Sequence, residues 1–381
     1  MLVYNLIGDT SFMKVAIVHD HFLYFGGAER VLLSLLKIFS QADVYLAFAS
    51  QQWLSVVKKS TSGKVFVSPF NKLPFVQQSA DWYKPIIFTY WEHLVLAKYD
   101  LVVSSSHSYS SKSVCVSRGT PHMSYVLTPP RFLYEEFNET QWLKKMPWRM
   151  MFGPFLSRMR QWDYKSAQRP DVLIASSKTV QDRMRRYYKR DSIVIYPPVA
   201  IPRKLPKRDP RYYVCVSRLV KQKGIDLAIR ACNKLRAPLV VVGKGAEEGR
   251  LRAAAGKTIT FRGFVSDEKM ADVYAGAKAL IFPAIDEDFG IIPVEAMAHG
   301  VPVIAYNSGG IRETVIDGKT GILFREYTTI ALRNEINRLE RLHFSQKTLR
   351  QHALRFSEKN FREKVREVVA FILEKQHNIA T

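Results

Sequence analysis

Short runs of apolar, often β-branched residues alternate with longer amphipathic stretches along the whole chain. In the longer stretches apolar residues recur every three or four positions, which predicts helices, whereas the short runs predict strands. The expected strands cover residues 14–19, 44–49, 64–68, 101–105, 125–128, 172–176 and 193–196, and then 212–217, 239–243, 259–263, 279–283, 303–306 and 321–324. Strands that alternate with helices in this way are typical of parallel sheets joined by crossover helices. The pattern therefore predicts an α/β protein.

A proline-rich break divides this pattern in two. Five prolines interrupt a basic stretch from residue 196 to residue 211 that has no helical pattern. We therefore expect two Rossmann-like, doubly wound domains, residues 1–198 and 199–381, that face each other across a cleft. The stretch from residue 329 to the end has a helical pattern, and we expect these terminal helices to pack back on the first domain. Ligands of open α/β sheets bind beyond the carboxyl ends of the strands, so we look for chemistry in the loops there.

Composition and charge narrow the class of protein. No run of eighteen uncharged apolar residues occurs, so we expect no membrane-spanning helix. The three cysteines, Cys115, Cys215 and Cys232, lack C-x-x-C spacing, which argues against a disulfide framework or a zinc site and favours a reducing cytosol. The first twelve residues lack the basic segment and cleavage site of a signal peptide, and Met13 is an alternative start. The formal net charge of +23 implies an anionic partner, namely nucleic acid, an anionic lipid surface or a phosphorylated substrate.

The most specific chemical pattern follows the expected strand 279–283. There Gly290 permits close approach of the backbone to a ligand, and Pro293 suits the first turn of a helix. The N–H groups that follow Gly290 would then point out of the helix start and bind a diphosphate. Glu295 would lie early in that helix, within reach of a ribose hydroxyl, and Glu287 would lie on the loop before it. The alternative is an ordinary capped helix with an acidic first turn.

A second pattern follows the expected strand 212–217, where Arg218 and Lys223 precede another helix. Arginine binds phosphate in a bidentate fashion and lysine binds it as a point charge, so the two would clamp a pyrophosphate. The alternative is a basic loop in solvent. The nearby Gly243-Lys244-Gly245 step is similar to a dinucleotide fingerprint, but the next glycine has the wrong spacing for that motif.

Two histidine-containing segments follow strands of the first domain. A His-Asp-His segment, residues 19–21, leads to Gly26 and Gly27, where the chain can pass close to a ligand before a helix begins. Neighbours on an extended chain point to different sides, so we do not expect residues 19–21 to bind a metal. His107 follows the strand 101–105 at the same edge of the expected sheet. A lone histidine there is either catalytic or part of the packing.

Taken together, these pieces resemble the family-4 glycosyltransferases, which have the GT-B architecture. The matching segments are GGAER, SSSH, VSRLVKQKG, VVGKGAEEGRL, FRGFVSDEKMADVYAGAKALIF, EDFGIIPVEAMAHGVPVIAYNSGG and ETVIDGKTGILF. Glu287 and Glu295 form the E-x7-E pair of that family, and the match runs nearly unbroken from Tyr213 to Phe324. The segments MKVAIVHDHF, YDLVVSSSH and TPPRF of the first domain are similar to mannosyltransferases of O-antigen and exopolysaccharide assembly.

The resemblance implies a nucleoside-diphosphate sugar as donor and transfer with retention of the anomeric configuration. Arg218 and Lys223 would stabilise the departing diphosphate in place of a metal ion, so neither a metal nor a cofactor is expected. Glu287 would hold sugar hydroxyls, His107 would contact the sugar near the reacting carbon, and Glu295 would bind the ribose. The remaining donor contacts are implied for Gly26, Gly27, Phe264, Val265, Phe289, Gly290 and Ile291.

The chain also departs from the family at one place. Relatives commonly carry a cysteine and a histidine before the Thr-Pro step, where this chain has Val126 and Leu127, so acceptor contacts there are not carried over. Asp286 and Asp288 form a D-x-D pattern, which holds a divalent metal in another glycosyltransferase fold. Their place deep in the second domain, beside Phe289, disfavours a metal there.

We therefore predict a cytosolic glycosyltransferase, peripheral at the inner membrane face, that moves mannose from GDP-mannose to a lipid-linked saccharide in cell-surface polysaccharide assembly. One alternative is a transferase that uses a UDP-sugar and a soluble acceptor. Another is a basic nucleic-acid-binding protein, which we do not favour because no nucleic-acid-binding signature is found. Two segments predict an anionic membrane surface as a partner. Residues 142–152 interleave large apolar side chains with cations, and basic residues cluster around Tyr187 and Tyr188.

Overall fold

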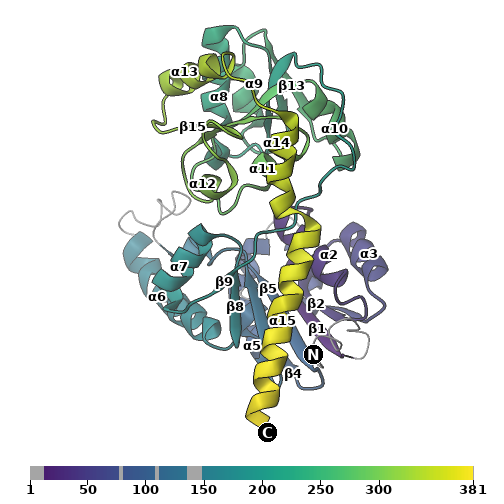
Figure 1. The fold of residues 1–381 in the computed structure, drawn as a ribbon. Coiled ribbons are helices and arrows are strands. Elements are labelled where there is room, and N and C mark those ends of the chain that lie inside the picture. Colours follow the sequence, from purple (N-terminus) through teal and green to yellow (C-terminus); the bar gives the residue numbers. More distant parts are fainter. Residues whose placement is uncertain (1–12, 77–79, 108–110, 135–147, 381) are drawn as a thin grey trace. The chain divides into compact units, whose positions relative to one another are not determined.

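The computed structural model describes residues 13–76, 80–107, 111–134 and 148–380 (Figure 1). The chain divides into two compact units, the first formed by Met1–Pro197 with Phe361–Thr381 and the second by Pro198–Asn360. This division lies next to the boundary expected at residue 198. The second domain, expected to run from residue 199 to residue 381, ends instead at Asn360, and nearly all of the last helix belongs to the first unit.

A seven-stranded parallel sheet forms the centre of the first unit. Its strands are, in spatial order, β3 (Val65–Val67), β2 (Asp43–Ala49), β1 (Val15–Phe22), β5 (Leu101–Ser106), β7 (His122–Val126), β8 (Val172–Ala175) and β9 (Ile193–Val194). Two short strands that the sequence pattern missed, β4 (Val95–Leu96) and β6 (Cys115–Val116), pair with each other. Because the chain order reverses between β1 and β5, the loops after these two strands lie at the topological switch point, where such sheets bind ligands.

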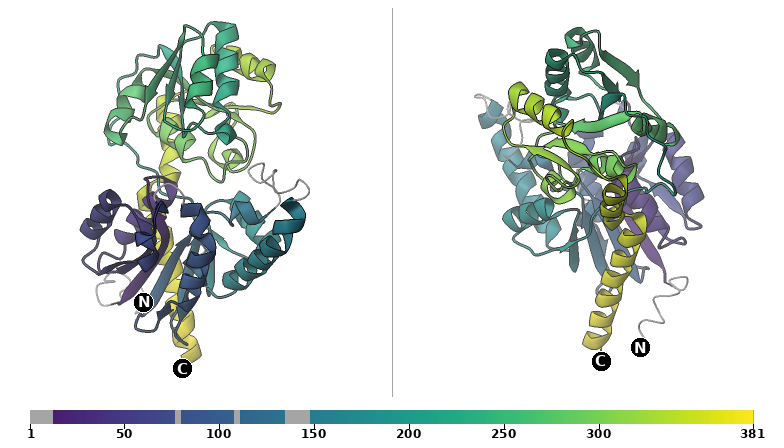
Figure 2. Two further views of the ribbon diagram at one scale, coloured as in Figure 1. Left: turned by 180° about the vertical axis from the view of Figure 1, so that it is seen from behind. Right: turned by 45° about the horizontal axis from the view of Figure 1, so that its top comes forward.

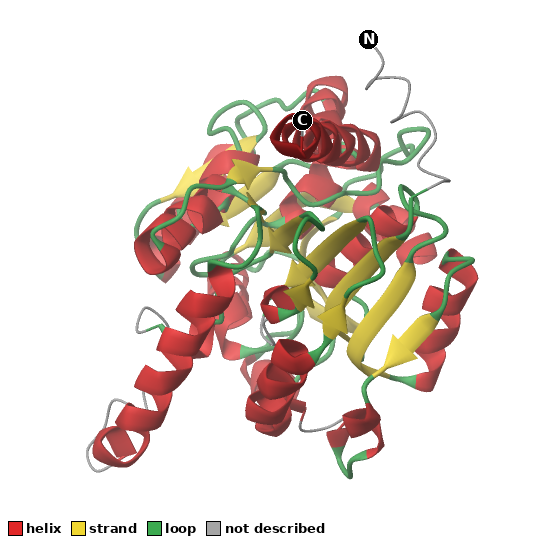
Figure 3. Cartoon of the chain, turned by 90° about the horizontal axis from the view of Figure 1, so that it is seen from below, coloured by secondary structure: helices red, strands yellow, loops and turns green. Residues whose placement is uncertain are grey.

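Helices cover both faces of this sheet (Figure 3). They are α2 (Gly27–Leu36), α3 (Gln51–Ser60), α5 (Lys84–His93), α6 (Trp148–Ala167), α7 (Lys178–Tyr188) and α15 (Glu358–Ala380). Helix α15 runs along one face of the sheet in each view (Figures 1 and 2). Its buried residues Phe361, Val365 and Val368 recur at helical spacing and join the same apolar core as Ile17 and Tyr125. The C-terminal helix is therefore part of the first unit's core.

The second unit contains a six-stranded parallel sheet in the Rossmann order. Its strands are, in spatial order, β12 (Ile259–Gly263), β11 (Leu239–Val242), β10 (Tyr212–Val216), β13 (Ala277–Phe282), β14 (Val303–Tyr306) and β15 (Gly321–Phe324). Its helices are α8 (Ile225–Leu235), α9 (Glu248–Ala254), α10 (Asp267–Ala275), α11 (Ile291–Ala298), α12 (Ile311–Thr314), α13 (Thr329–Leu339) and α14 (Gln346–Ala353). Here the chain order reverses between β10 and β13, so the loops after these strands are the second place to expect a ligand.

Each expected strand overlaps an observed one, and the largest shift is at β7. This strand was expected over residues 125–128 but begins at His122 and ends at Val126. The strand begins with a polar residue, His122, which the pattern of apolar residues does not include. His122 is nevertheless fully buried, and its Nε2 atom lies 2.9 Å from the Ser104 hydroxyl oxygen. A buried polar side chain that finds such a partner is compatible with a central strand.

Candidate functional site

In the second unit, the loop after β13 turns into α11 at Gly290. The φ angle of Gly290 is +91°, and a Cβ atom there would lie 2.5 Å from the Ile311 Cδ1 atom. The backbone angle therefore favours glycine, and a side chain there would also displace the end of the Ile311 side chain. The turn places the N–H groups that start α11 beyond the carboxyl end of β13, the geometry that favours an anion.

The same edge of the sheet brings Lys223 and Glu287 together. Lys223 ends a short 3₁₀ turn after β10, and Glu287 lies on the loop after β13. The Lys223 Nζ atom lies 2.6 Å from the Glu287 Oε2 atom, and both side chains are only partly exposed, at 19% and 25%. Arg218, on the same loop as Lys223, is exposed. Three of the residues predicted to handle the diphosphate and the sugar thus lie on the two loops at the switch point.

A pair of glycines supports the Glu287 loop from behind. The Gly310 N–H donates to the Glu287 carbonyl oxygen at 2.7 Å, and the Asp286 N–H donates to the Ser308 hydroxyl at 3.0 Å. A Cβ atom on Gly309, whose φ angle is +57°, would lie 2.3 Å from the Glu287 carbonyl oxygen. The loop can therefore keep this course only if no side chain is present at residue 309. The sequence shows these glycines, but it does not show which loop they support.

The other residues predicted for donor binding lie in different environments. Glu295 lies on α11 and is 94% buried, with an exposed fraction of 6%. The Phe289 ring is buried against Phe356, so only the backbone of Phe289 remains for a ligand. Phe264 and Val265 follow the carboxyl end of β12, and the Phe264 ring is 75% exposed. Ile291 is the first residue of α11 and is half-buried.

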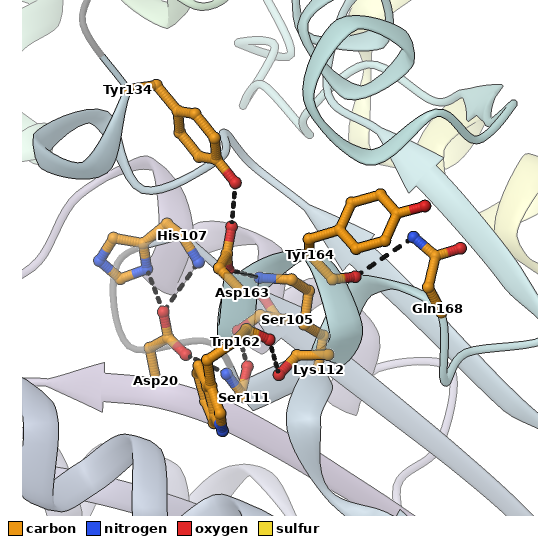
Figure 4. Close-up of polar contacts among 11 residues, drawn as sticks. Asp20, Ser105, His107, Ser111, Lys112, Tyr134, Trp162, Asp163, Tyr164 and Gln168 are labelled. Atoms are coloured by element: carbon orange, nitrogen blue, oxygen red, sulfur yellow. Dashed lines mark hydrogen bonds and ion pairs between the residues drawn. The ribbon is translucent and has the colours of Figure 1, made fainter. Parts of the chain in front are cut away.

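In the first unit, His107 meets a buried carboxylate (Figure 4). Asp20, near the end of β1, is fully buried, and its Oδ2 atom accepts a hydrogen bond from the His107 backbone N–H at 2.8 Å. The same oxygen lies 3.3 Å from the His107 Nδ1 atom, and the His107 side chain is 18% exposed. The Asp20 Oδ1 atom accepts from the Ser111 N–H at 2.8 Å. From the sequence, Asp20 is considered only as a metal ligand, because no local motif predicts its contact with His107.

A buried ion pair lies beside this group. The Lys112 ammonium and the Asp163 carboxylate of α6 are both fully buried and in contact, and the Tyr134 hydroxyl donates to Asp163 at 2.8 Å (Figure 4). A buried charge is tolerated only where such partners are present. Since Lys112 follows Ser111 directly, this pair holds the chain next to a residue that donates to Asp20.

The start of α2 has a buried acid as well as glycines. Gly26 precedes the helix, Gly27 begins it, and Glu29 in its first turn is 2% exposed. The Glu29 Oε1 atom lies 4.0 Å from the His21 Nδ1 atom. An anion that approaches Gly26 and Gly27 would therefore meet a carboxylate as well as the helix N–H groups.

Two neighbouring histidines are held neutral by burial. Burial lowers the pKa of His19 to about 3, with a smaller contribution from His107, and it lowers the pKa of His21 well below its ordinary value. Within the described parts of the chain, no group of three or more His, Cys, Asp or Glu side chains has an arrangement that would hold a metal ion. The His-Asp-His segment thus supplies one charged group, Asp20, and two neutral rings.

We expect the buried histidines to make stability fall on acidification. His19 and His122 both have a pKa of about 3 in the folded protein against an ordinary 6.5, so the unfolded chain binds protons first as the pH drops below about 6.5. Each group then removes up to about 1.4 kcal/mol of unfolding free energy per pH unit. Denaturant titrations between pH 7 and pH 5 measure this slope. Unfolding of the variant His19→Phe should take up one proton fewer, so its unfolding free energy should depend less steeply on pH. An unchanged slope would contradict the lowered pKa of His19.

The segments predicted to meet a membrane are only partly supported. Residues 142–147 lie outside the described residues, as do the side chains of residues 148–152. In and after α7, Arg183 is 6% exposed, and Arg190 donates to the carbonyl oxygens of Ala167 and Pro170, so these two cations are not available to a lipid surface. Arg186 and Lys189 remain exposed. No described helix is both long and apolar enough to cross a membrane.

Two family models match adjoining parts of the chain. The model described as "Glycosyltransferase Family 4" matches residues 25–203, and the model described as "Glycosyl transferases group 1" matches residues 200–356. Among solved structures, the chain resembles Anabaena Alr3699/HepE in complex with UDP and glucose, with 20% identity over 94% of this chain and 99% of that one, and a TM-score of 0.70. It also resembles WaaG, a glycosyltransferase involved in lipopolysaccharide biosynthesis, with 16% identity over 93% and 99% of the chains and a TM-score of 0.63. At these identities the likenesses show the fold.

Curated relatives match shorter stretches. An uncharacterised glycosyltransferase of Methanocaldococcus jannaschii is 30% identical over 50% of this chain and 55% of its own length. A GDP-mannose-dependent alpha-(1-6)-phosphatidylinositol monomannoside mannosyltransferase of Mycolicibacterium smegmatis is 41% identical over 28% of this chain and 33% of its own. The chain therefore spans about half or less of the length of these relatives.

Proposed function

We propose that this chain, which belongs to the family-4 glycosyltransferases of the GT-B fold, transfers a sugar from a nucleoside-diphosphate sugar with retention of the anomeric configuration. The observation that carries the proposal is the Lys223–Glu287 pair, 2.6 Å between Nζ and Oε2, on the two switch-point loops of the second unit. The lysine ammonium can bind the diphosphate of such a donor, and the glutamate carboxylate beside it can accept hydrogen bonds from the hydroxyl groups of the sugar.

The side chains suggest how the bond to the leaving group is broken. As the bond from the sugar to the diphosphate lengthens, negative charge grows on the diphosphate oxygens. We propose that Arg218, Lys223 and the start of α11, all at the same edge of the sheet, stabilise this charge. Glu287 would bind hydroxyls of the sugar, Glu295 the ribose, and His107 the sugar near the reacting carbon. Because protein cations meet the charge, we propose that neither a metal ion nor another cofactor takes part.

For the donor we propose GDP-mannose. The support is the similarity to a relative whose name states GDP-mannose dependence, over 28% of this chain. The specific alternative is a UDP-sugar, because a structure of similar fold was solved with UDP and glucose. For the acceptor we propose a lipid-linked saccharide, reached at an anionic inner membrane surface. The formal net charge of +23 is the observation that favours such a surface.

A screen for nucleotide release tests these proposals together. We expect the purified chain, given GDP-mannose and a lipid extract as acceptor source, to release GDP faster than it releases UDP from UDP-sugars. It should do so in excess EDTA, because Arg218 and Lys223 take the place of a metal. Activity that is lost in EDTA and restored by manganese would instead support a metal at Asp286 and Asp288. Transfer to soluble sugars alone would contradict the lipid acceptor.

The same sample separates the enzyme from a nucleic-acid-binding protein. Binding to random duplex that weakens steeply with salt, without any binding of sugar nucleotides, would favour that other class.

A further inference from the structure

The carboxylate of Asp20 is bonded on both of its oxygen atoms. Oδ2 accepts from the His107 backbone N–H and lies 3.3 Å from the His107 Nδ1 atom, and Oδ1 accepts from the Ser111 N–H. Asp20 lies on β1 and His107 directly after the neighbouring strand β5, 87 positions later in the sequence. It is fully buried, so these contacts help to compensate its charge for the loss of water.

The charge of Asp20 also acts on the other two rings, where it raises the pKa against the larger, opposing effect of burial. His19 and His21 are neutral because burial lowers the pKa of each. Lys112, the nearby buried cation, is in contact with Asp163, whose second oxygen accepts from Tyr134. His107 differs from the two neutral rings in that its side chain is partly exposed. A negative charge 3.3 Å from one ring nitrogen of a histidine favours the tautomer that carries the proton on that nitrogen.

We propose that Asp20 is a positioning residue for His107. The negative charge of its carboxylate favours the tautomer with the proton on Nδ1, so that Nε2 is the bare nitrogen presented to the transferred sugar. This inference rests on the proposed function, since it assigns His107 its orientation in that reaction. It extends the function to a residue that lies in the core and touches no substrate.

The contacts around residue 20 explain why an aspartate, with its short side chain, fits near the end of β1. The side chain is short and emerges near the end of the central strand β1, so its two oxygens reach residues on both sides of the turn after β5. The Ser111 hydroxyl adds a bond to the Ser105 carbonyl oxygen at 2.9 Å, and the Lys112–Asp163 pair holds the next residue. These contacts hold Ser111 and Lys112, whereas the Asp20 carboxylate lies against the His107 ring (Figure 4). The His21 ring packs edge-on against the same ring, with 4.9 Å between the ring centroids.

Nuclear magnetic resonance can determine directly which ring nitrogen of His107 carries the proton. In protein labelled with ¹⁵N-histidine, we expect the His107 signals at neutral pH, assigned with His107→Gln, to show a protonated Nδ1 and a bare Nε2. The variant Asp20→Asn should lose this preference, because an amide offers either an oxygen or an N–H to the ring. The reverse tautomer in the parent protein, or the same tautomer in Asp20→Asn, would overturn the proposal whether or not the protein proves to be a transferase.

Kinetics test whether the effect reaches the reaction through His107. Asp20→Asn should lower kcat on the order of ten- to a hundred-fold, as loss of an orienting partner does elsewhere, with little change in the KM for the donor. In a His107→Ala background the same change should cost no further activity. An equal loss in both backgrounds would mean a structural role and overturn the proposal.

A matched control perturbs the same turn without touching the ring. Ser111→Ala removes the hydroxyl bond to Ser105 but keeps the N–H that donates to Asp20, so kcat and tautomer should match the parent. Thermal unfolding of each variant checks that the fold is retained. If the parent releases no nucleotide from any sugar nucleotide, the proposed function fails, while the tautomer still decides the role of Asp20.

Discussion

Replacement of Arg218 by alanine should lower the turnover number by about a hundred-fold or more, as the loss of one preorganised group that stabilises transition-state charge does in other enzymes. Arg218 lies on the loop after β10, exposed, at the edge where Lys223 and the start of α11 also lie. Its guanidinium can bind two phosphate oxygens at once, which the ammonium of Lys223 cannot do. The measurement is kcat for nucleotide release at saturating donor.

A second arginine of the same unit supplies the control. Arg338 on α13 is 48% exposed and pairs with Glu335 three residues earlier on the same helix. A surface pair of this kind contributes at most about 1 kcal/mol of stability, so Arg338→Ala should keep the activity of the parent. An Arg218→Ala variant with turnover within a factor of two of the parent would refute the diphosphate role.

The sequence predicts the second unit well because its chemistry is local. Gly290, Glu287 and Glu295 lie within nine residues of one another, and Arg218 and Lys223 within six, so strand and helix patterns alone place each group at a sheet edge. The sequence does not predict that the loop with Arg218 and Lys223 contacts the loop with Glu287. The Lys223–Glu287 pair joins residues 64 apart, and their approach depends on β10 and β13 being neighbours.

The first unit is predicted less well, because its polar groups meet through the fold. Asp20 and Ser111 are 91 residues apart, and Lys112 and Asp163 are 51 apart. A buried aspartate on a strand has no local pattern that separates it from a solvent-exposed one. Only the pairing of β1 with β5 brings the first two residues together.

Charge counting misleads for a related physical reason. The basic cluster around Tyr187 suggested a membrane face, yet Arg190 binds backbone carbonyl oxygens and Arg183 is buried. Arginine carries five N–H donors, so it is well suited to hold carbonyl groups inside a protein. The number of cationic residues in a sequence segment is therefore larger than the number that its surface exposes to a partner.

The two glutamates of the E-x7-E pair should respond oppositely to removal of their charge. Glu287→Gln should lower turnover on the order of a hundred-fold, because its proposed partner is the sugar, whose charge changes during transfer. The nucleoside diphosphate should bind at least as tightly as before, because the negative charge 2.6 Å from the Lys223 ammonium is removed and no longer competes with the phosphates for that cation. Calorimetry with GDP and UDP measures this binding.

The same substitution at Glu295 tests its proposed role in binding the ribose. Glu295→Gln should weaken binding of both the donor and the free nucleoside diphosphate, because the ribose proposed as its partner is present in both. Each substitution replaces one oxygen by nitrogen with little change in volume, so a difference between the variants reports charge rather than packing. If Glu287→Gln weakens nucleotide binding and Glu295→Gln leaves it unchanged, the two roles are assigned the wrong way round. The Lys223–Glu287 contact would then hold the loops in place and not mark the division between diphosphate and sugar.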